Sequence, residues 1–451
     1  MSLTDQILLE LARTDGQVTS KIIYDLIKDH APRREKMIEL YHRYKGEKDG
    51  VPVLTRNFQD KNKINNKLAN DFFGDIIDTK VGYFAGQAIS YNLDKESDNY
   101  ERNTEIISDF QTRNDIEDID AETAKMAAIM GVEGRLCYID RDGLERVMLV
   151  PGWECIWVTD ISINEPQYAL RYYTITQNDR ERYRVEWYDD RMVTYFIGDK
   201  EGGFVREGQE FHLFDEIPLV AFVNNSEKQG DAEKVLTLID GYDNAISDVN
   251  SEIEQFRLAY MAFYGVEIDE EMLERAKRTG AFGLPDDAKM EFVTKMLEDT
   301  IVEHHLDRLE DNIMRFAKSV NFADEKFAGT QSGVSLRYKM LALESKCITA
   351  ERKFAAALRQ MFRVLSTAWQ KKGITIDPND IFFEFKRNFP LNLLDEAETT
   401  SKLRGQVSEQ TRLSLLSFVD NADYELELME QENAGRVDLD MVEDEADEPT
   451  E

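Results

Sequence analysis

Two long stretches of the chain repeat their apolar residues at alternating steps of four and three, and this pattern constrains the fold more than any other feature. It covers residues 233–264 and 296–320. Such spacing forms a seam along one side of a helix, which packs lengthwise against a neighbouring helix. No proline lies between Pro218 and Pro285, so nothing in the first stretch would break a helix. The seam residues are Val235, Ile239, Tyr242, Ile246, Val249, Ile253 and Phe256 in the first stretch, and Val302, Leu306, Leu309, Ile313 and Phe316 in the second.

Residues 265–295 separate these two helices and differ from them in composition. They contain Gly280, Gly283 and Pro285 between two short apolar runs, which predicts a small folded unit instead of continued helix. A long antiparallel helix pair with a small unit between its two helices is a stalk with a tip.

The 232 residues before the stalk predict helices followed by an antiparallel sheet, which is an α+β arrangement. Pro32 is expected to begin a second short helix, which Gly46 would end. The other expected helices cover 20–30, 62–87, 99–113 and 116–130. After Gly131 the period changes to two, which is typical of strands. The expected strands cover 136–139, 146–150, 153–159, 168–175, 183–188, 192–197 and 217–223.

A polar loop and a very long helix follow the stalk. Residues 321–333 are polar and contain glycine, whereas 334–372 contain neither glycine nor proline and are rich in helix formers. A strand is expected over 381–385 and further helix over 395–432. From residue 438 the acidic end has too little apolar surface to fold. The residues expected on the buried side of the long helix are Val334, Tyr338, Leu341, Ile348, Phe354, Leu358, Met361, Leu365 and Trp369.

The net charge of −34 over 451 residues limits the possible functions. It argues against a protein that grips nucleic acid by neutralising phosphates. It is compatible with an acidic surface that repels DNA or attracts basic partners, and also with simple solubility. No apolar run approaches the ~20 residues of a membrane span, and the N-terminus lacks the basic region of a secretory signal. The three cysteines fit core residues made in a reducing cytoplasm.

The sequence contains no recognisable catalytic, metal or cofactor site. It has no phosphate-binding G-x-x-x-x-G-K-[ST], no G-x-G-x-x-G after a strand, no H-E-x-x-H and no G-x-S-x-G. His304 and His305 would point to different sides of one helix and could not chelate one metal together. Asp240, Asp243 and Asp248 are expected on the solvated outside of the first stalk helix. We therefore expect no enzyme activity, no metal and no cofactor.

The order of elements and three stretches of sequence resemble a known family. The order is helix-rich start, meander sheet, long helix, small tip unit, long helix, polar loop, very long helix and helical end. The stretches are residues 62–86 (NKINNKLANDFFGDIIDTKVGYFAG), 217–225 (IPLVAFVNN) leading into 236–251 (LTLIDGYDNAISDVNS), and 327–344 (FAGTQSGVSLRYKMLALE). Together they resemble the portal proteins of tailed bacteriophages, in the branch common among siphophages of Gram-positive hosts. The similarity covers nearly the whole chain, although the part after Asp395 is shorter than in larger members.

The resemblance implies a predominantly helical α+β portal fold and a division of the chain into named parts. These would be the wing (1–232), the first stem helix (233–264), the clip (265–295), the second stem helix (296–320), the tunnel loop (321–333), a long wing helix and strand (334–392), a small crown (393–437) and an acidic tail (438–451). The tunnel-loop residues implied to face DNA are Asn321, Asp324, Glu325, Lys326, Phe327, Thr330, Gln331 and Ser332. The implied clip residues are Glu270, Glu271, Arg275, Lys277 and Arg278.

The function implied by the resemblance is that of a non-enzymatic ring, twelve-fold in the virion. Double-stranded DNA would enter through its channel during genome packaging and leave through it during ejection. The implied partners are other copies of the chain, the terminase large subunit, head-completion and tail proteins, and the scaffolding and major capsid proteins. The ring would lie at the portal vertex of the virion after assembly in the host cytoplasm, without a membrane.

Two other classes of function stay open on the residues alone. The long helices could form a binding scaffold that docks a basic partner while no DNA passes. An enzyme that acts on nucleic acid, such as a nuclease, would need a cluster of carboxylates for two metals, and the sequence does not reveal one.

Overall fold

The computed structural model describes most of the chain. It covers residues 3–14, 16–59, 63–159, 166–177, 179–199, 202–256, 260–281, 283–285, 287–293, 299–321, 333–388, 393–416, 419, 422 and 424–431. The chain divides into two units: the first comprises Met1–Asn321 with Ala342–Arg387, and the second comprises Phe322–Leu341 with Asn388–Glu451. About 52% of the chain is helical and 21% is strand, so the predicted α+β class with a helical majority is confirmed.

Helices fill the N-terminal part of the first unit. They are α1 (Leu3–Arg13), α2 (Ser20–Tyr44), α3 (Pro52–Thr55), α4 (Phe72–Ala85), α5 (Tyr100–Arg113) and α6 (Ile116–Met130). The predicted helices over 99–113 and 116–130 are confirmed. The helix predicted over 62–87 is wrong in its first part, because residues 64–71 carry no helix and α4 begins only at Phe72, where the Asp71 side chain accepts a hydrogen bond from the Gly74 N–H.

Pro32 lies inside α2, so the predicted break into two short helices is wrong. A proline in a helix interior cannot donate its backbone hydrogen bond, and this is normally costly. Both halves of α2 are nevertheless held by packing. Ile22 and Leu26 belong to one core cluster, whereas Met37 and Leu40 belong to another. Burial on both sides of the proline therefore keeps the helix continuous.

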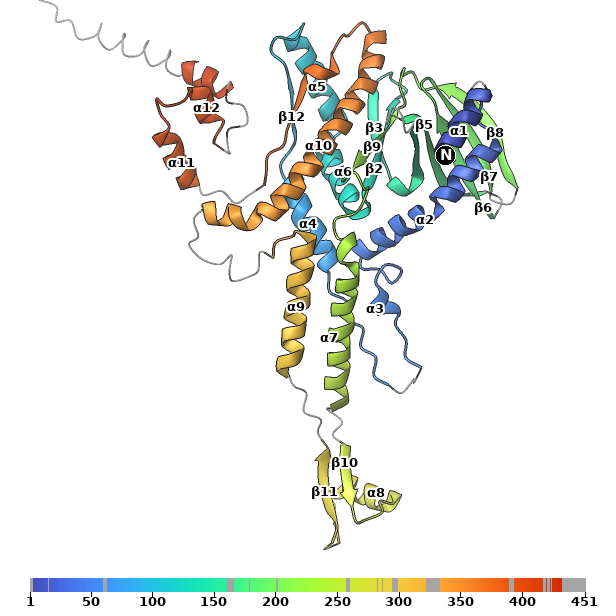
Figure 1. Cartoon of the computed structure of the whole chain (residues 1–451), viewed down its shortest axis with the longest axis vertical. Coiled ribbons are helices and arrows are strands. Elements are labelled where there is room, and N and C mark those ends of the chain that lie inside the picture. The colour runs from blue at the N-terminus through green and yellow to red at the C-terminus, as the bar shows by residue number, and fades with distance from the viewer. Residues whose placement is uncertain are drawn as a thin grey trace, which may run out of the picture. The chain divides into compact units, whose positions relative to one another are not determined.

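The strands after residue 131 form two antiparallel sheets instead of one meander (Figure 1). The first has the order β3-β2-β9, from β2 (Val132–Ile139), β3 (Glu145–Val150) and β9 (Leu219–Val223). The second runs in sequence order through β4 (Cys155–Thr159), β5 (Pro166–Gln177), β6 (Arg180–Tyr188), β7 (Met192–Asp199) and β8 (Gly203–Phe211). The sequence does not reveal β8 because most of its side chains are exposed, so it has no apolar alternation.

The long helix is α10 (Gly333–Lys371). The prediction of its buried side is right for the C-terminal half of the helix and wrong for the N-terminal half. Phe354, Leu358, Met361, Leu365 and Trp369 are buried as predicted. By contrast, Tyr338, Leu341 and Ile348 are 75%, 59% and 38% exposed. The buried stripe instead continues through Met340, Leu343, Cys347 and Ala350, which keep the rotational phase of Phe354 and Leu358. The side chain of Val334 lies outside the described residues.

Short elements complete both units. In the first unit, β12 (Ile381–Glu384) confirms the predicted strand and pairs antiparallel with β1 (Ser90–Leu93). In the second unit, residues 424–431 are helical as predicted, whereas the first part of the helical stretch predicted over 395–432 is divided into α11 (Leu393–Lys402) and α12 (Glu409–Leu413). They are separated by a turn in which Gly405 adopts a φ of +77°, a left-handed conformation that ends helices. The acidic tail predicted over 438–451 lies outside the described residues.

Candidate functional site

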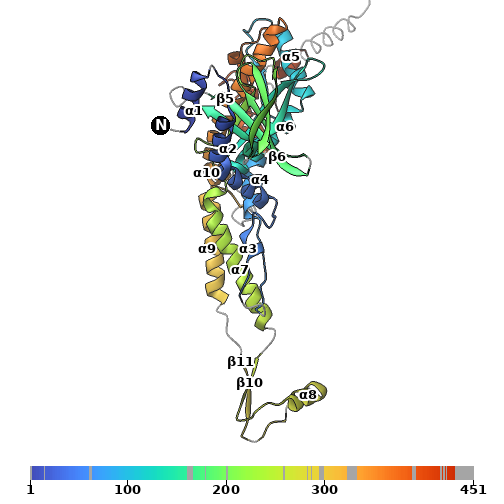
Figure 2. The ribbon, with the colours of Figure 1, turned by 90° about the vertical axis from the view of Figure 1, so that its right-hand side faces the viewer.

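The heptad-patterned stretches form two helices that pack against each other. They are α7 (Leu236–Phe256), which follows a 3₁₀ turn over Glu233–Val235, and α9 (Asp299–Ala317). Figures 1 and 2 both show them side by side. The first helix ends earlier than predicted, because Tyr260–Tyr264 forms the strand β10. This run of aromatic and small residues pairs with β11 (Lys289–Val293), and aromatic residues favour strands. Met296, where the second helix was predicted to begin, lies outside the described residues.

Among the seam residues with described side chains, those that are well buried lie at the start of α7 and at Ile313 of α9. Val235, Ile239 and Ile313 are at most 1% exposed. Ile253 and Phe316 are 51% and 56% exposed, although their spacing places them in the same pattern. The remaining seam residues with described side chains are partly buried, namely Tyr242, Ile246, Val249, Val302, Leu306 and Leu309. The side chain of Phe256 lies outside the described residues. The isolated pair therefore leaves apolar surface uncovered.

A polar stripe on α7 holds an extended segment of the same chain. Asp243, Ser247 and Ser251 are buried at four-residue steps along the helix. Each accepts a hydrogen bond of 2.9 Å from a backbone N–H, namely that of Asn70, Leu68 and Asn66 respectively. Alternate residues of an extended chain advance ~6.6 Å, which matches the ~6 Å rise of four helical residues. This match explains why residues 64–71 are extended instead of helical.

The prediction that the carboxylates of α7 lie on a solvated face is therefore partly wrong. Asp243 is 2% exposed. Asp240 pairs with the buried guanidinium of Arg43, whereas the Asp248 side chain is 63% exposed and lies 2.9 Å from Arg56. Carboxylates on this side of the helix hold the N-terminal part of the chain against it. Sequence reasoning missed this role, although the spacing of Asp243, Ser247 and Ser251 was a usable signal.

Replacing Ser247 with alanine tests the polar stripe. The change leaves the Leu68 N–H without the buried Ser247 hydroxyl that accepts its hydrogen bond, which should lower the free energy of unfolding by about 1–3 kcal/mol. Denaturant unfolding of the purified protein measures this difference. Thr237→Ala, at an exposed position of the same helix, is the matched control and should have little effect. Equal effects of the two substitutions would mean that the serine hydroxyl does not hold the segment.

A buried ionic cluster ties the start of α7 and the end of α9 to α10. We call Asp231, Lys80 and Lys346 the root cluster. The Asp231 carboxylate lies 2.6 Å from the Lys80 ammonium and 3.0 Å from the Lys346 ammonium. Lys80 also donates to Asn224 Oδ1 at 2.5 Å, and Lys346 donates to the carbonyl of Ala317, the last residue of α9, at 2.8 Å. The cluster thus joins α4, α9, α10 and the chain just before α7.

Electrostatics decide the protonation of the root cluster. Burial alone would raise the pKa of Asp231, but the ammonium groups of Lys80 and Lys346 lower it below its usual value of 3.8. Burial lowers the pKa of Lys346, and the nearby Asp231 carboxylate opposes that shift. Asp231 is therefore ionised at neutral pH and holds two cations. No sequence pattern could have revealed this cluster, because its members lie more than a hundred residues apart.

The tip between the two stalk helices contains a hairpin and a short helix. The helix α8 (Glu270–Thr279) begins where Asp269 caps the Met272 N–H and ends at Gly280, which adopts a φ of +71°. The predicted tip residues Glu270, Glu271, Arg275, Lys277 and Arg278 are all exposed on this helix. Some are paired within the helix, since Arg275 lies 3.7 Å from Glu271 and Lys277 lies 2.9 Å from Glu274. Within the described residues, the structure does not bring these side chains together with any other predicted site.

The polar loop predicted over 321–333 lies almost entirely outside the described residues. Asn321 is described, and its side-chain amide donates to Glu310 Oε1 of α9 at 3.1 Å. The other predicted loop residues, Asp324, Glu325, Lys326, Phe327, Thr330, Gln331 and Ser332, are among those not described.

The described ranges hold neither a metal-binding cluster nor a helix that could span a membrane. No group of three or more His, Cys, Asp or Glu side chains is placed there to hold a metal ion. His304 and His305 are exposed on α9. None of the helices described is both long enough and apolar enough to span a bilayer.

Comparison with known protein families shows to which family this chain belongs. A profile of the family described as "Phage portal protein, SPP1 Gp6-like" matches residues 24–438. The chain belongs to this family of phage portal proteins. The portal protein of Bacillus phage SPP1 is 23% identical over 460 residues, covering 95% of this chain and 89% of the relative. The portal protein of Clostridium phage phiCD119 is 21% identical over 436 residues, covering 88% of this chain and 92% of the relative.

The predicted resemblance to phage portal proteins is thus confirmed. This portal protein acts at the portal vertex, where the phage genome is packaged and later ejected. Membership also implies the general features of the family, which are a structural role in the capsid and a homo-oligomeric ring that works with DNA, terminase and capsid proteins. The helix pair, the tip and the loop are therefore parts of a portal protein.

Proposed function

We propose that twelve copies of this portal protein close into a ring in the virion, with their α7–α9 pairs surrounding the DNA channel. The observation that supports this is the apolar surface left uncovered on the pair. Ile253, Ile301 and Phe316 are 51%, 64% and 56% exposed. Identical neighbours can cover such residues through heterologous contacts that close by rotation. At −34 each, twelve copies would carry about −400, a field that keeps DNA from binding to the channel wall.

The parts of the chain take the following roles in this proposal. The α7–α9 pair is the stem, residues 1–232 with the long helix and strand of 334–392 form the wing, and residues 393–437 form the crown. The clip, residues 265–295, docks the terminase large subunit during filling and head-completion proteins afterwards. The tunnel loop, residues 321–333, faces the DNA. The wing meets scaffolding and major capsid proteins during assembly in the host cytoplasm.

Imaging of the purified full chain tests the ring directly. Negative-stain averages and native mass should show closed rings with a central channel, alone or after mixing with scaffolding or capsid protein. A protein that stays monomeric under all of these conditions would contradict the proposal and favour a binding scaffold through which no DNA passes.

Replacing Ile301 with glutamate tests whether stem contacts hold the ring. A charge at an interface that excludes water must be desolvated, so the variant should assemble at least about tenfold less well than the wild type, while its unfolding midpoint stays near the native value because the side chain is exposed in one copy. Native mass spectrometry over a concentration series measures the assembly. Thr300→Glu places the same charge at an exposed position about 100° around the helix from Ile301 and should assemble normally. Wild-type assembly of the Ile301 variant would contradict the contact.

A further inference from the structure

The solvent face of α10 carries a row of basic side chains in an otherwise acidic protein. Arg352, Arg359 and Arg363 are exposed, together with Ile348 and Ala356 between or beside them. Their steps of four and three residues place them on one face of the helix, opposite the buried stripe. We call these five residues the arginine row. Arg363 Nε lies 2.7 Å from Glu216, whereas Arg352 and Arg359 make no ion pair within the described residues.

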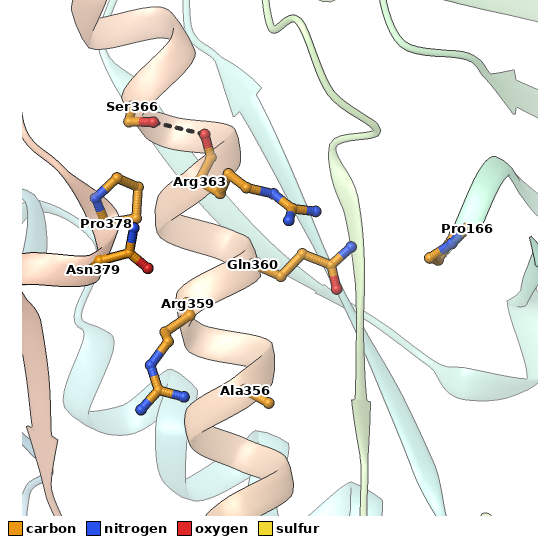
Figure 3. A pocket seen from close by; sticks show the side chains of 8 residues that line it. All are labelled: Pro166, Ala356, Arg359, Gln360, Arg363, Ser366, Pro378 and Asn379. Carbon is orange, nitrogen blue, oxygen red and sulfur yellow. Dashed lines mark hydrogen bonds between the residues drawn. The ribbon is translucent and has the colours of Figure 1, made fainter. Parts of the chain in front are cut away.

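A pocket of about 420 Å³ opens beside the arginine row. Arg359, Gln360 and Arg363 line it from α10, and Pro166, Pro378 and Asn379 line it from other parts of the first unit. Figure 3 shows the side chains of Gln360 and Arg363 extending from the helix toward Pro166, and that of Arg359 extending from the other side. The row therefore borders a hollow that can receive side chains from another molecule.

A complementary acidic surface lies on α5 of the same unit. Glu101, Glu105 and Asp109 are exposed at four-residue steps, and they make no ion pair in the part of the chain that is described. We call them the acidic ridge. Arg102 is the exposed cation beside them, so the ridge keeps a net negative charge.

The acidic ridge cannot reach the arginine row of its own chain. The opposite face of α5 is buried, and its Phe110 ring packs edge-on against Phe362 and Trp369 of α10 at centroid distances of 6.0 and 6.1 Å. The ridge consequently points away from α10. Two surfaces of opposite charge thus lie on different faces of one unit, and Arg352, Arg359 and the acidic ridge make no ion pair within the described residues.

We propose that the arginine row of one copy contacts the acidic ridge of the next copy around the ring. This inference rests on the proposed ring, because a closed ring is built from heterologous contacts between two different patches. Charge complementarity of this kind selects the partner surface and the register. A duplex DNA would also attract arginines, but this row also contains the apolar side chains of Ile348 and Ala356, and it belongs to an acidic protein of net charge −34. A neighbouring copy fits these observations better.

Charge reversal with complementary rescue tests the contact. Arg352→Glu with Arg359→Glu, and separately Glu101→Lys with Glu105→Lys, should each raise the protein concentration needed for half-assembly about tenfold or more at low salt. All four substitutions in one chain restore opposite charges and should bring assembly back to within about threefold of the wild type. Lys21→Glu with Lys48→Glu reverses two exposed lysines elsewhere and is the matched control, which should assemble normally. Thermal unfolding checks that each variant is folded.

The possible outcomes separate this contact from the ring itself. If the wild type forms no ring, the proposed function fails first. If the wild type and both reversed variants assemble equally well, only the arginine row and acidic ridge are wrong. The same is true if Arg352→Glu with Arg359→Glu assembles normally but loses salt-sensitive binding of a linear DNA duplex, which would assign the row to DNA. Failure of the four-fold variant to recover, with its fold intact, would also overturn the pairing.

Discussion

Replacing Asp231 with asparagine should lower the free energy of unfolding by about 3–5 kcal/mol at pH 7. The carboxylate of Asp231 is the anion between Lys80 and Lys346, and the side chains of Asp231 and Lys80 are 2% and 4% exposed. Removing the negative charge leaves ammonium groups buried without a counter-ion, which is more costly than the loss of a surface pair. Because Lys346 also binds the last carbonyl of α9, the variant should loosen the base of the stalk.

The effect of Asp231→Asn should depend on pH in a defined direction. The pKa of Asp231 in the folded protein is lowered below 3.8. The ionised carboxylate therefore contributes its full stability above its unfolded pKa, and this contribution is lost as the pH falls through the folded pKa. The difference between wild type and variant should accordingly shrink below pH 3.8. Denaturant unfolding at pH 7 and at the lowest pH that keeps the wild type folded measures it.

Asp215→Asn is the matched control for the root cluster. Asp215 pairs with Lys371 at 3.0 Å, but the two side chains are 52% and 47% exposed, so solvent screens the pair and its loss should matter little. A small effect of Asp231→Asn, similar to that of the control, would mean that the buried lysines find other partners. Amide hydrogen exchange near the end of α9 would report whether the base of the stalk has loosened.

The sequence was sufficient to predict what depends on regular periodicity. Helices α5 and α6, the strands β5 to β7, and the helix pair all follow from apolar spacing. The order of these elements, with three stretches of sequence, was sufficient to identify the portal family. These features are local or depend only on order along the chain, so one sequence carries them.

The features that the sequence did not predict depend on contacts between distant residues. Pro32 remains inside a helix because two core clusters hold its two sides. Residues 64–71 are extended because Ser247 and its neighbours on α7 accept their backbone N–H groups. Tyr338 and Ile348 fit an apolar spacing yet are exposed, since a second stripe of apolar residues on the same helix faces the core. In each case tertiary packing selected between alternatives that local propensity left open.

Replacing Arg135 with methionine should cost about as much as Asp231→Asn, but its dependence on pH should fall in a higher pH range. Arg135 is fully buried in β2 and donates to Asp120 Oδ1 of α6 at 2.7 Å and to Thr123 Oγ1 at 2.8 Å. Its guanidinium also lies over the Phe222 ring at 4.1 Å. Methionine fills much of the volume but leaves the Asp120 carboxylate buried without its cation, so we expect a loss of about 3–5 kcal/mol at pH 7.5.

The pH dependence distinguishes this pair from the root cluster. Burial raises the pKa of Asp120 above 3.8 even though the Arg135 guanidinium opposes the shift. A carboxyl whose folded pKa is raised contributes most stability at low pH, and this contribution is lost as the pH rises through the folded pKa. Removing Arg135 raises that pKa further, so the deficit of the variant should be smaller at pH 5 than at pH 7.5.

The double variant, Arg135→Met with Asp120→Asn, is the decisive control because it removes the buried charge altogether. Asparagine can still accept the hydrogen bond that the Tyr91 hydroxyl donates to Asp120 at 2.7 Å. At pH 7.5 the double variant should therefore be more stable than Arg135→Met alone, and its stability should depend less on pH between 5 and 7.5. If the two variants unfold at the same denaturant concentration at both pH values, the cost comes from lost packing around Phe222 and not from an unpaired carboxylate. A loss that is large only without the second substitution would show that β2 and α6 are joined by charge at the centre of the first unit.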